Sequence, residues 1–254
     1  MGSEMCIRDR FGIETMPQTG ENVADEFGIS REDQDAFALR SQQRAKAATE
    51  RGFFVDEICP VHVPVRRGDP IAVIEDEHPR PDLTLEALQK LKPFVRSDGT
   101  ITAGNASGIN DGACVLLVAS DAMVQQFSLK PIARVVRTVA VGVPPRIMGI
   151  GPASATQKLL AASQVSIDDV GVIELNEAFA SQSLAVLREL GIPDDSSQVN
   201  PNGGAIALGH PLGMSGARLV LTAARQMQRV DKPFAICTLC VGVGQGVAML
   251  LERA

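Results

Sequence analysis

Three residues in the second half of the chain have types and positions suited to acid–base chemistry, and His210 is the first of them. It lies in a glycine-rich run over residues 200–218, directly before Pro211 and ahead of a helix expected to reach residue 229. The positive end of that helix would disfavour an imidazolium, which predicts a neutral, basic ring. A histidine that only caps a helix remains an alternative. The glycines fit close approach of the backbone either to a ligand or to another helix.

Cys240 and Asn176 are the other two candidates. Cys240 ends an expected strand and precedes the stretch 241–246, where glycine N–H groups suit an oxyanion hole. Asn176 follows a strand expected over 172–175, and open α/β sheets bind ligands at the carboxyl ends of their strands. A buried structural thiol and a helix N-cap are the open alternatives for these two residues. Their convergence on one edge of a sheet favours a shared site.

Other motifs in the sequence are less informative. Cys237 and Cys240 spell a CxxC pattern, but a metal site needs a second ligand pair and a redox site needs a helix N-terminus. Residues three apart on a strand also point to opposite faces. His62 is expected on the solvent-exposed face of its strand, and His78 has no second ligand nearby in the sequence, so neither predicts a metal site.

The elements that must position these residues alternate regularly from residue 130 onward. A strand–helix order of βαβαβαββ predicts a mostly parallel sheet with an antiparallel end. The helix containing residues 219–224 is apolar on every face, so we expect it to be covered on more than one side. The predicted strands cover 132–141, 170–175, 198–200, 234–240 and 246–252, and the predicted helices cover 153–162, 177–190 and the segment up to 229.

The first half of the chain has a polar, loop-rich character. A peripheral helix is expected from Ser30 to about residue 51, where Gly52 ends it. A small-residue run over 102–108 fits either tight packing or contact with a slender ligand. The remaining expectations are an irregular segment over 11–29, strands over 57–65, 71–74 and 113–119, and a helix over 84–91.

Composition excludes several classes of protein. The 254 residues carry a net charge of −6, with neither Trp nor Tyr, which argues against a nucleic-acid or anionic-membrane partner. Five widely spaced cysteines indicate thiols in a reducing compartment, the cytoplasm. Residues 1–10 resemble the translation of a sequencing-library adapter, so we expect a non-native leader there, with the true N-terminal part of the gene missing.

Three segments in combination resemble the C-terminal signatures of the thiolase family. They are residues 176–180, 203–211 and 240–246, and residues 102–107 are similar to the pantetheine-contacting stretch of that family. The resemblance implies an α/β fold of layered αβαβα type, built from two similar halves with a loop domain between them. Residues 11–128 would then be an incomplete loop domain with the end of the N-terminal half, and 129–254 the C-terminal domain.

The resemblance also implies a role for each candidate. His210 would activate a nucleophilic cysteine, and Cys240 would move the second proton. Asn176 would hold a water that forms one oxyanion hole with His210, and the Gly242 N–H would belong to the other. The residues expected to line the CoA tail or the acyl pocket are Met16, Ala103, Ser107, Ala178 and Phe179.

The implied activity is thiolytic cleavage of a 3-oxoacyl-CoA to acetyl-CoA and a shortened acyl-CoA, with CoA as co-substrate and no permanently bound cofactor or metal. The implied assembly is a homodimer or homotetramer. The segments 66–70, 77–81, 146–152 and 237–246 are most similar to family members that cleave 3-oxoadipyl-CoA in the β-ketoadipate pathway of aromatic degradation. An acetoacetyl-CoA or fatty-acid thiolase, and a non-catalytic CoA-ester or lipid-binding relative, are the alternatives.

Two features depart from the family pattern. Val243 stands where glycine is common, which narrows the space beside Gly242. No position matches the motif of the nucleophilic cysteine, and neither Cys59 nor Cys114 is a credible substitute. We therefore expect the 254-residue chain to be inactive by itself. A terminal carboxylate on the substrate would need a cationic partner, for which Arg66, Arg67, Arg80 and Arg146 are candidates. The same arginines could instead contact the CoA phosphates or simply be solvated.

Overall fold

A mixed four-stranded sheet forms the centre of the molecule in a computed structural model, which describes residues 14–254. The leader expected over residues 1–10 lies outside this range. The spatial order of the strands is β3-β6-β5-β4, with β4 and β5 parallel and both pairs that involve β6 antiparallel. The strands are β3 (Ala133–Gly142), β4 (Val170–Leu175), β5 (Phe234–Val241) and β6 (Gln245–Arg253).

Three of these strands, β3, β4 and β5, run in the same direction as expected, but the antiparallel strand β6 lies between β3 and β5 and not at an end of the sheet. A tight turn brings β6 back beside β5, and β3 then pairs with the free edge of β6 in the antiparallel direction. The strand expected over 198–200 is reduced to a single parallel bridge between Val199 and Ile173. The predicted positions of the four strands agree with the structure to within a residue or so.

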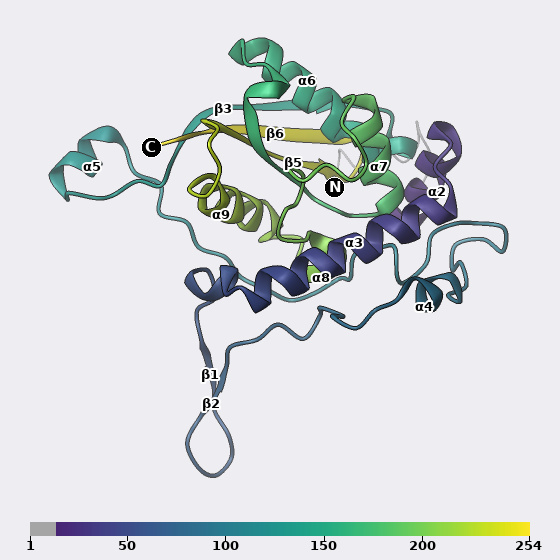
Figure 1. Cartoon of the computed structure of the whole chain (residues 1–254), viewed down its shortest axis with the longest axis horizontal. Helices are drawn as coiled ribbons and strands as arrows, with labels where there is room; N and C mark the ends of the chain where they lie inside the picture. Colours follow the sequence, from purple (N-terminus) through teal and green to yellow (C-terminus); the bar gives the residue numbers. More distant parts are fainter. Residues whose placement is uncertain (1–13) are drawn as a thin grey trace, which may run out of the picture.

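Helices cover both faces of the sheet, with α6 and α7 on one side and α9 on the other (Figure 1). On the first face, Leu159 and Leu184 belong to the same buried cluster as Ile236 of β5. On the second, Leu219 of α9 packs in a cluster with Ala235 of the same strand. Successive residues of β5 thus face opposite layers, as the period of a strand requires. No helix among residues 14–254 is long and apolar enough to cross a membrane.

The remaining elements surround this three-layered body. In Figure 1, α3 crosses below α7, and the β1–β2 hairpin extends away from the body as an arm. The helices are α2 (Met16–Phe27), α3 (Arg31–Glu50), α4 (Leu85–Gln89), α5 (Asp121–Gln126), α6 (Gly151–Ser163), α7 (Ala180–Glu189), α8 (Ala205–Leu208) and α9 (Ser215–Met227). The short elements are β1 (Val61–Val63), β2 (Ile71–Val73) and the 3-10 turns η1 (Phe53–Asp56), η2 (Pro145–Ile150) and η3 (Ile167–Asp169).

Residues 16–27 form the helix α2, where an irregular segment was expected. The Thr15 side chain accepts from the backbone N–H of Gln18 and caps the helix start, and Gly28 ends the helix at a φ of 62°. Pro17 lies in the first turn, where its missing N–H has no intrahelical partner in any case. The proline therefore marks a helix start and not a break.

Helix α3 is central, where a peripheral helix was expected. Its polar side chains Asp35, Ser41 and Gln42 are buried. Each has a partner: Asp35 pairs with Arg31 at 2.8 Å, and Ser41 donates to Glu177 at 2.6 Å. A polar helix face can lie in the interior when most of its groups are hydrogen-bonded, and here the side-chain oxygen of Gln34 is the exception among the described residues of α3.

Residues 113–119 form no strand, although one was expected there. Val115, Leu117 and Val118 are between 81% and 89% exposed. A strand requires a neighbour for its backbone, and within residues 14–254 none of the paired strands lies beside this segment. Its apolar, strand-like sequence remains without a hydrogen-bonded partner in this part of the chain.

Candidate active site

His210 and Asn176 meet between the glycine-rich run and the carboxyl end of β4. The Nε2 atom of His210 lies 3.4 Å from the Asn176 side-chain nitrogen, and its Nδ1 lies 2.6 Å from the Ser215 hydroxyl. That hydroxyl donates its hydrogen to the Pro211 carbonyl at 2.9 Å, so its oxygen accepts from Nδ1–H of the imidazole. The unprotonated Nε2 therefore faces Asn176, which is the tautomer that a general base requires.

Ser215 is a site residue that the sequence analysis missed. It begins α9 and reaches back to the histidine five positions earlier. A serine in the first turn after a histidine was the available signal, but such serines usually serve the helix itself. Only the fold of the intervening Pro211–Met214 turn brings the two side chains together.

The pKa of His210 is lowered, first by burial and then by the positive charge of Arg218. A neutral ring was expected, but from a helix N-terminus at His210, and α9 begins only at Ser215. Arg218 is held by the buried carboxylate of Glu174 at 2.8 Å. Burial raises the pKa of Glu174 to about 7 in spite of this ion pair.

Asn176 is not a helix N-cap, because α7 begins at Ala180 with Phe179 in the capping position. The backbone N–H of Asn176 donates to the Thr238 carbonyl at 3.0 Å, which fixes the residue against the parallel strand β5. Its side-chain oxygen is buried and has no hydrogen-bond partner in the structure. An unpaired buried amide oxygen beside His210 suits a water or a substrate atom.

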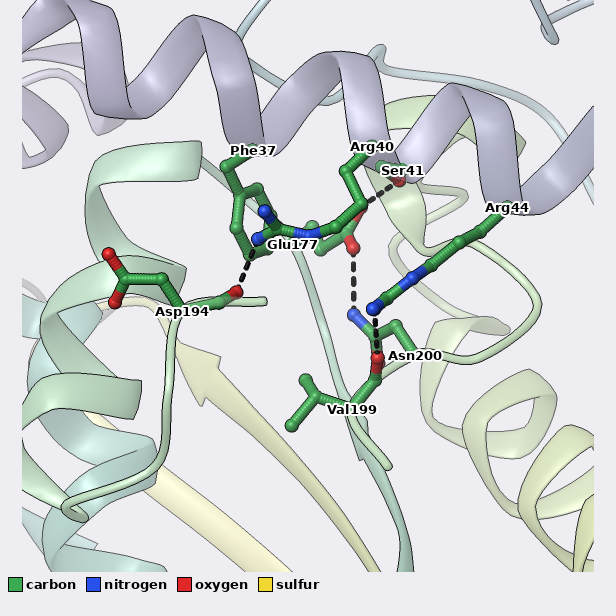
Figure 2. A pocket seen from close by; sticks show the side chains of 8 residues that line it. All are labelled: Phe37, Arg40, Ser41, Arg44, Glu177, Asp194, Val199 and Asn200. Carbon is green, nitrogen blue, oxygen red and sulfur yellow. Dashed lines mark hydrogen bonds between the residues drawn. The ribbon is translucent and has the colours of Figure 1, made fainter. Parts of the chain in front are cut away.

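Glu177 lies in the same loop, and not in the first helical turn where it was expected. Its carboxylate is fully buried and accepts from Ser41 at 2.6 Å, from Asn200 at 2.8 Å and from the Ile206 N–H at 3.1 Å. Figure 2 shows it between α3 and Asn200. The adjoining pocket of about 10 Å³ has room for roughly one water, so it is no acyl-CoA site. Glu177 instead ties α3 to the glycine-rich run.

Cys240 lies near the carboxyl end of β5, opposite Gly246 of β6. It is buried, and burial raises the pKa of its thiol to about 12, so the thiol is protonated at neutral pH. Cys237 belongs to the cluster on the α9 face, where its thiol lies 3.5 Å from the Leu219 carbonyl. The two cysteines thus face opposite sides of the sheet, as predicted.

Gly242 follows Cys240 in the turn between β5 and β6. Apart from the adjoining Val241 and Val243, nothing in the described chain lies within 4 Å of a Cβ added at Gly242. The next residue, Val243, has a φ of 67°, a conformation that is strained for a β-branched side chain. At Gly244 the φ is 89° and the Val143 carbonyl lies 2.3 Å from an added Cβ, so this position requires glycine.

Three of the residues expected to contact CoA come together in the structure. The backbone N–H of Ser107 donates to the Ala178 carbonyl at 3.0 Å, and the hydroxyl of Ser107 lies 3.2 Å from the same oxygen. Ala106 forms an isolated bridge with Phe179. The small-residue run therefore lies along the loop that carries Asn176.

The other two residues expected to contact CoA are Ala103 and Met16, and among the described residues neither forms a hydrogen bond with this group of three. Ala103 is exposed in the same small-residue run. Met16 begins α2 and is 44% exposed. It is one helical turn from Gly20, whose Cα packs against the Phe179 ring, with 3.0 Å from an added Cβ to that ring.

Among the four candidate arginines, Arg146 already pairs with Glu26 at 2.6 Å. Arg66, Arg67 and Arg80 are exposed. The first two lie in the arm between β1 and β2, which extends away from the body (Figure 1).

The glycine-rich run approaches protein atoms at its first positions. An added Cβ would lie 2.7 Å from Ala45 at Gly203, 2.2 Å from Glu177 at Gly204, and 2.6 Å from Asn110 at Gly209. These glycines therefore permit close packing, partly against helix α3, which was one of the two interpretations of the run. Gly213 and Gly216 have open space beside them instead.

Both parts of the chain match models of one family. Residues 1–122 match the N-terminal domain of thiolase, and residues 129–253 match its C-terminal domain. The chain belongs to the thiolase family.

Among curated proteins, a beta-ketoadipyl-CoA thiolase from Acinetobacter baylyi is 56% identical over 247 residues, and one from Pseudomonas aeruginosa is 60% identical over 247 residues. Each alignment covers 97% of this chain, but only 62% and 61% of the respective relative. A solved structure of human mitochondrial 3-ketoacyl-CoA thiolase in complex with CoA matches with a TM-score of 0.88 and 45% identity, covering 94% of this chain and 59% of that one. The chain thus has the thiolase fold and spans less than two thirds of the length of these relatives.

Proposed function

We propose that the whole protein to which this chain corresponds is a thiolase that cleaves 3-oxoadipyl-CoA with CoA, giving succinyl-CoA and acetyl-CoA. The observation that carries the chemistry is the pairing of a base and an acid at adjoining strand ends. His210 presents an unprotonated Nε2 beside Asn176, and Cys240 is a protonated thiol at the end of the neighbouring strand. The names of the relatives at 56% and 60% identity support the substrate.

The proposed reaction uses each group once in each half-reaction. His210 accepts the proton of a nucleophilic cysteine, whose sulfur attacks the 3-oxo carbonyl. When the bond between C2 and C3 breaks, its electron pair remains on the acetyl-CoA fragment as an enolate, and the Cys240 thiol donates a proton to it. Burial raises the pKa of the Cys240 thiol, so the proton that it would donate is present at neutral pH. CoA then attacks the acyl-cysteine. The Cys240 thiolate accepts the proton of the CoA thiol, and the protonated His210 returns its proton to the departing cysteine sulfur as succinyl-CoA is released.

The oxyanions of these steps need donors in a site from which water is excluded. We assign a water held by Asn176 together with His210 to one oxyanion hole, and the N–H of Gly242 to the other. The open space beside Gly242 and the unpaired side-chain oxygen of Asn176 are consistent with these roles.

We further propose that CoA binds as a co-substrate along the loop formed by Ser107, Ala178 and Phe179, with Ala103 and Met16 at its margin. The contact between Ser107 and Ala178 supports this placement. A homodimer or homotetramer in the cytoplasm is part of the same proposal. The free thiols of Cys59, Cys114, Cys237 and Cys240 suit a reducing compartment.

The test is a comparison of kcat/KM for 3-oxoadipyl-CoA and acetoacetyl-CoA with the full-length protein. We expect a clear preference for 3-oxoadipyl-CoA, and a preference for acetoacetyl-CoA would contradict the substrate assignment. Replacing Cys240 with alanine should lower kcat by at least ~100-fold, because general acid catalysis is lost. Unchanged turnover of Cys240→Ala would remove the role proposed for that thiol.

A further inference from the structure

His78 contacts two segments that adjoin His210, namely α8 and the segment around Asn110, although the sequence shows no role for it. It is half-buried in the extended segment after β2. Its Nε2 lies 3.3 Å from the Ile206 carbonyl of α8, and its Nδ1 lies 3.3 Å from the side-chain nitrogen of Asn110. The side-chain oxygen of Asn110 in turn accepts from the backbone N–H of His210 at 3.1 Å.

The direction of each hydrogen bond in this chain of contacts follows from its ends. The His210 N–H only donates, so Asn110 presents its oxygen to His210 and its amide hydrogens to His78. The Ile206 carbonyl only accepts, so Nε2 of His78 carries the hydrogen. Nδ1 is then the acceptor for the Asn110 amide. Every donor meets an acceptor only when His78 is neutral and in the Nε2–H tautomer.

Two glycines make room for this arrangement. A Cβ at Gly108 would lie 2.5 Å from the Cε1 atom of His78. A Cβ at Gly209, where φ is +91°, would lie 2.6 Å from the Asn110 side-chain oxygen. The Gly108 carbonyl also accepts from the His210 N–H at 3.2 Å. The close approach is thus built into the backbone on both sides of the contact.

The segment that carries His78 is itself fixed to the body. Gln42 of α3 accepts from the Arg80 N–H at 2.8 Å through its side-chain oxygen. Its side-chain nitrogen donates to the Ile206 carbonyl at 3.2 Å, the same oxygen that His78 contacts. The imidazole therefore joins α8, which precedes His210 in the run, to the segment around Asn110 that supports the His210 backbone.

From this geometry we infer that His78 and Asn110 are positioning residues that hold the backbone of His210 through a directed hydrogen-bond relay. Neither residue touches the reacting atoms. They fix the position of the His210 backbone and thereby the position of its imidazole. The consequence for catalysis rests on the proposed function, whereas the relay itself does not.

The test measures hydrogen exchange of the His210 amide in the 254-residue chain, with the Leu250 amide of β6 as a monitor of the fold. His78→Phe keeps a ring of similar shape but neither hydrogen bond. His78→Gln keeps both, because its amide nitrogen can donate to Ile206 while its oxygen accepts from Asn110. We expect exchange at His210 to become about tenfold faster in His78→Phe and in Asn110→Ala, because the Asn110 acceptor is then unanchored or lost and only the Gly108 carbonyl remains for the His210 N–H. In His78→Gln it should stay within about twofold of the unchanged chain.

A residue that only fills space would give the opposite order, with Phe retaining protection and Gln losing it, and that result would overturn the proposal. Unchanged His210 exchange in His78→Phe would overturn it as well. If the Leu250 amide also exchanges faster in His78→Phe, the variant is unfolding and a second measurement is needed. Long-range ¹H–¹⁵N spectra of the unchanged chain then show which ring nitrogen of His78 carries the hydrogen, and only three histidines have to be assigned. A hydrogen on Nε2 of His78 supports the relay, and a hydrogen on Nδ1 contradicts it. None of these readouts needs turnover, so the proposed function can fail independently.

Discussion

His210 takes its properties as a base from two residues of α9. Ser215 fixes the tautomer by accepting from Nδ1, and Arg218 adds to burial in lowering the pKa of the ring. Because Glu174 holds Arg218 in place, a buried ion pair on β4 and α9 acts on the imidazole without touching it. Ser215 therefore acts on the ring nitrogen that does not face Asn176, and Arg218 acts on the ring through its charge.

Removing Arg218 should raise the pKa of His210. In Arg218→Gln the positive charge near the ring is lost while burial remains, so the pKa should move part of the way toward its ordinary value. The measurement is an NMR titration of the His210 ring, with the exposed His62 ring as an internal reference. Arg225→Gln removes a charge from the same helix near Asp56 and is the matched control. Equal shifts of His210 in the two variants would contradict the specific role of Arg218.

At the scale of single residues, motif spacing was sufficient to select Asn176, His210 and Cys240 as candidates. It could not identify Ser215 or His78, because their roles depend on partners that only the folded chain brings near. Glu177 was misread for a related reason. An Asn-Glu pair after a strand is typical of a helix start, and local sequence does not reveal that three groups from elsewhere converge on this carboxylate.

At the scale of elements, the glycine-rich run is held against α3 at one end and is free at the other. Gly203→Ala should destabilise the chain by about 3 kcal/mol, because φ is +82° and the added Cβ would lie 2.8 Å from the Ser41 carbonyl. Gly216→Ala is the matched control inside α9, where open space and helix propensity predict a gain of roughly 0.5–1 kcal/mol. Urea unfolding of both variants measures the difference, and similar values for the two would contradict the packing assigned to Gly203.

The elements that sequence patterns located well are those whose burial follows a simple period. Strand β4 was predicted at its observed bounds because one layer of helices covers each side of the sheet. Helix α2 is not apparent from the sequence because proline and glycine are usually unfavourable in helices, whereas Pro17 lies in the first turn and Gly20 is needed for contact with the Phe179 ring. The strand expected over 113–119 failed for a different reason, since a strand exists only where another strand receives it.

At the scale of the whole molecule, burial of Glu174 should make stability depend on pH. Its pKa is about 7 in the folded chain against 4.5 in an unfolded one, so the folded state binds more protons between these values. Stability is therefore highest at the acid end of this window and falls as pH rises through it, by on the order of 3 kcal/mol for this group. Glu174→Gln should remove that part of the slope, as measured by urea unfolding at several pH values from 5 to 8. Parallel pH profiles of the two proteins would show that Glu174 is ionised throughout.

The 254-residue chain should form no acyl-enzyme on its own. Burial raises the pKa of Cys114, Cys237 and Cys240, so little thiolate is present at neutral pH, and Cys59 lies exposed ahead of β1. Incubation with acetyl-CoA followed by intact mass measurement should show an unchanged mass. A stoichiometric acetyl adduct on Cys59 or Cys114, accompanied by turnover, would show that the nucleophile has been placed in the wrong part of the protein.

The position of β6 affects the order in which this protein can be completed during synthesis. Among the four strands β6 is made last, yet it lies in the interior of the sheet, between β3 and β5. At ordinary rates of translation β3 leaves the ribosome on the order of ten seconds before the strand that it pairs with. Its backbone must remain solvated or shielded for that time. The turn with Gly242 forms only when β6 pairs with β5, so sheet and site are completed in the same late step.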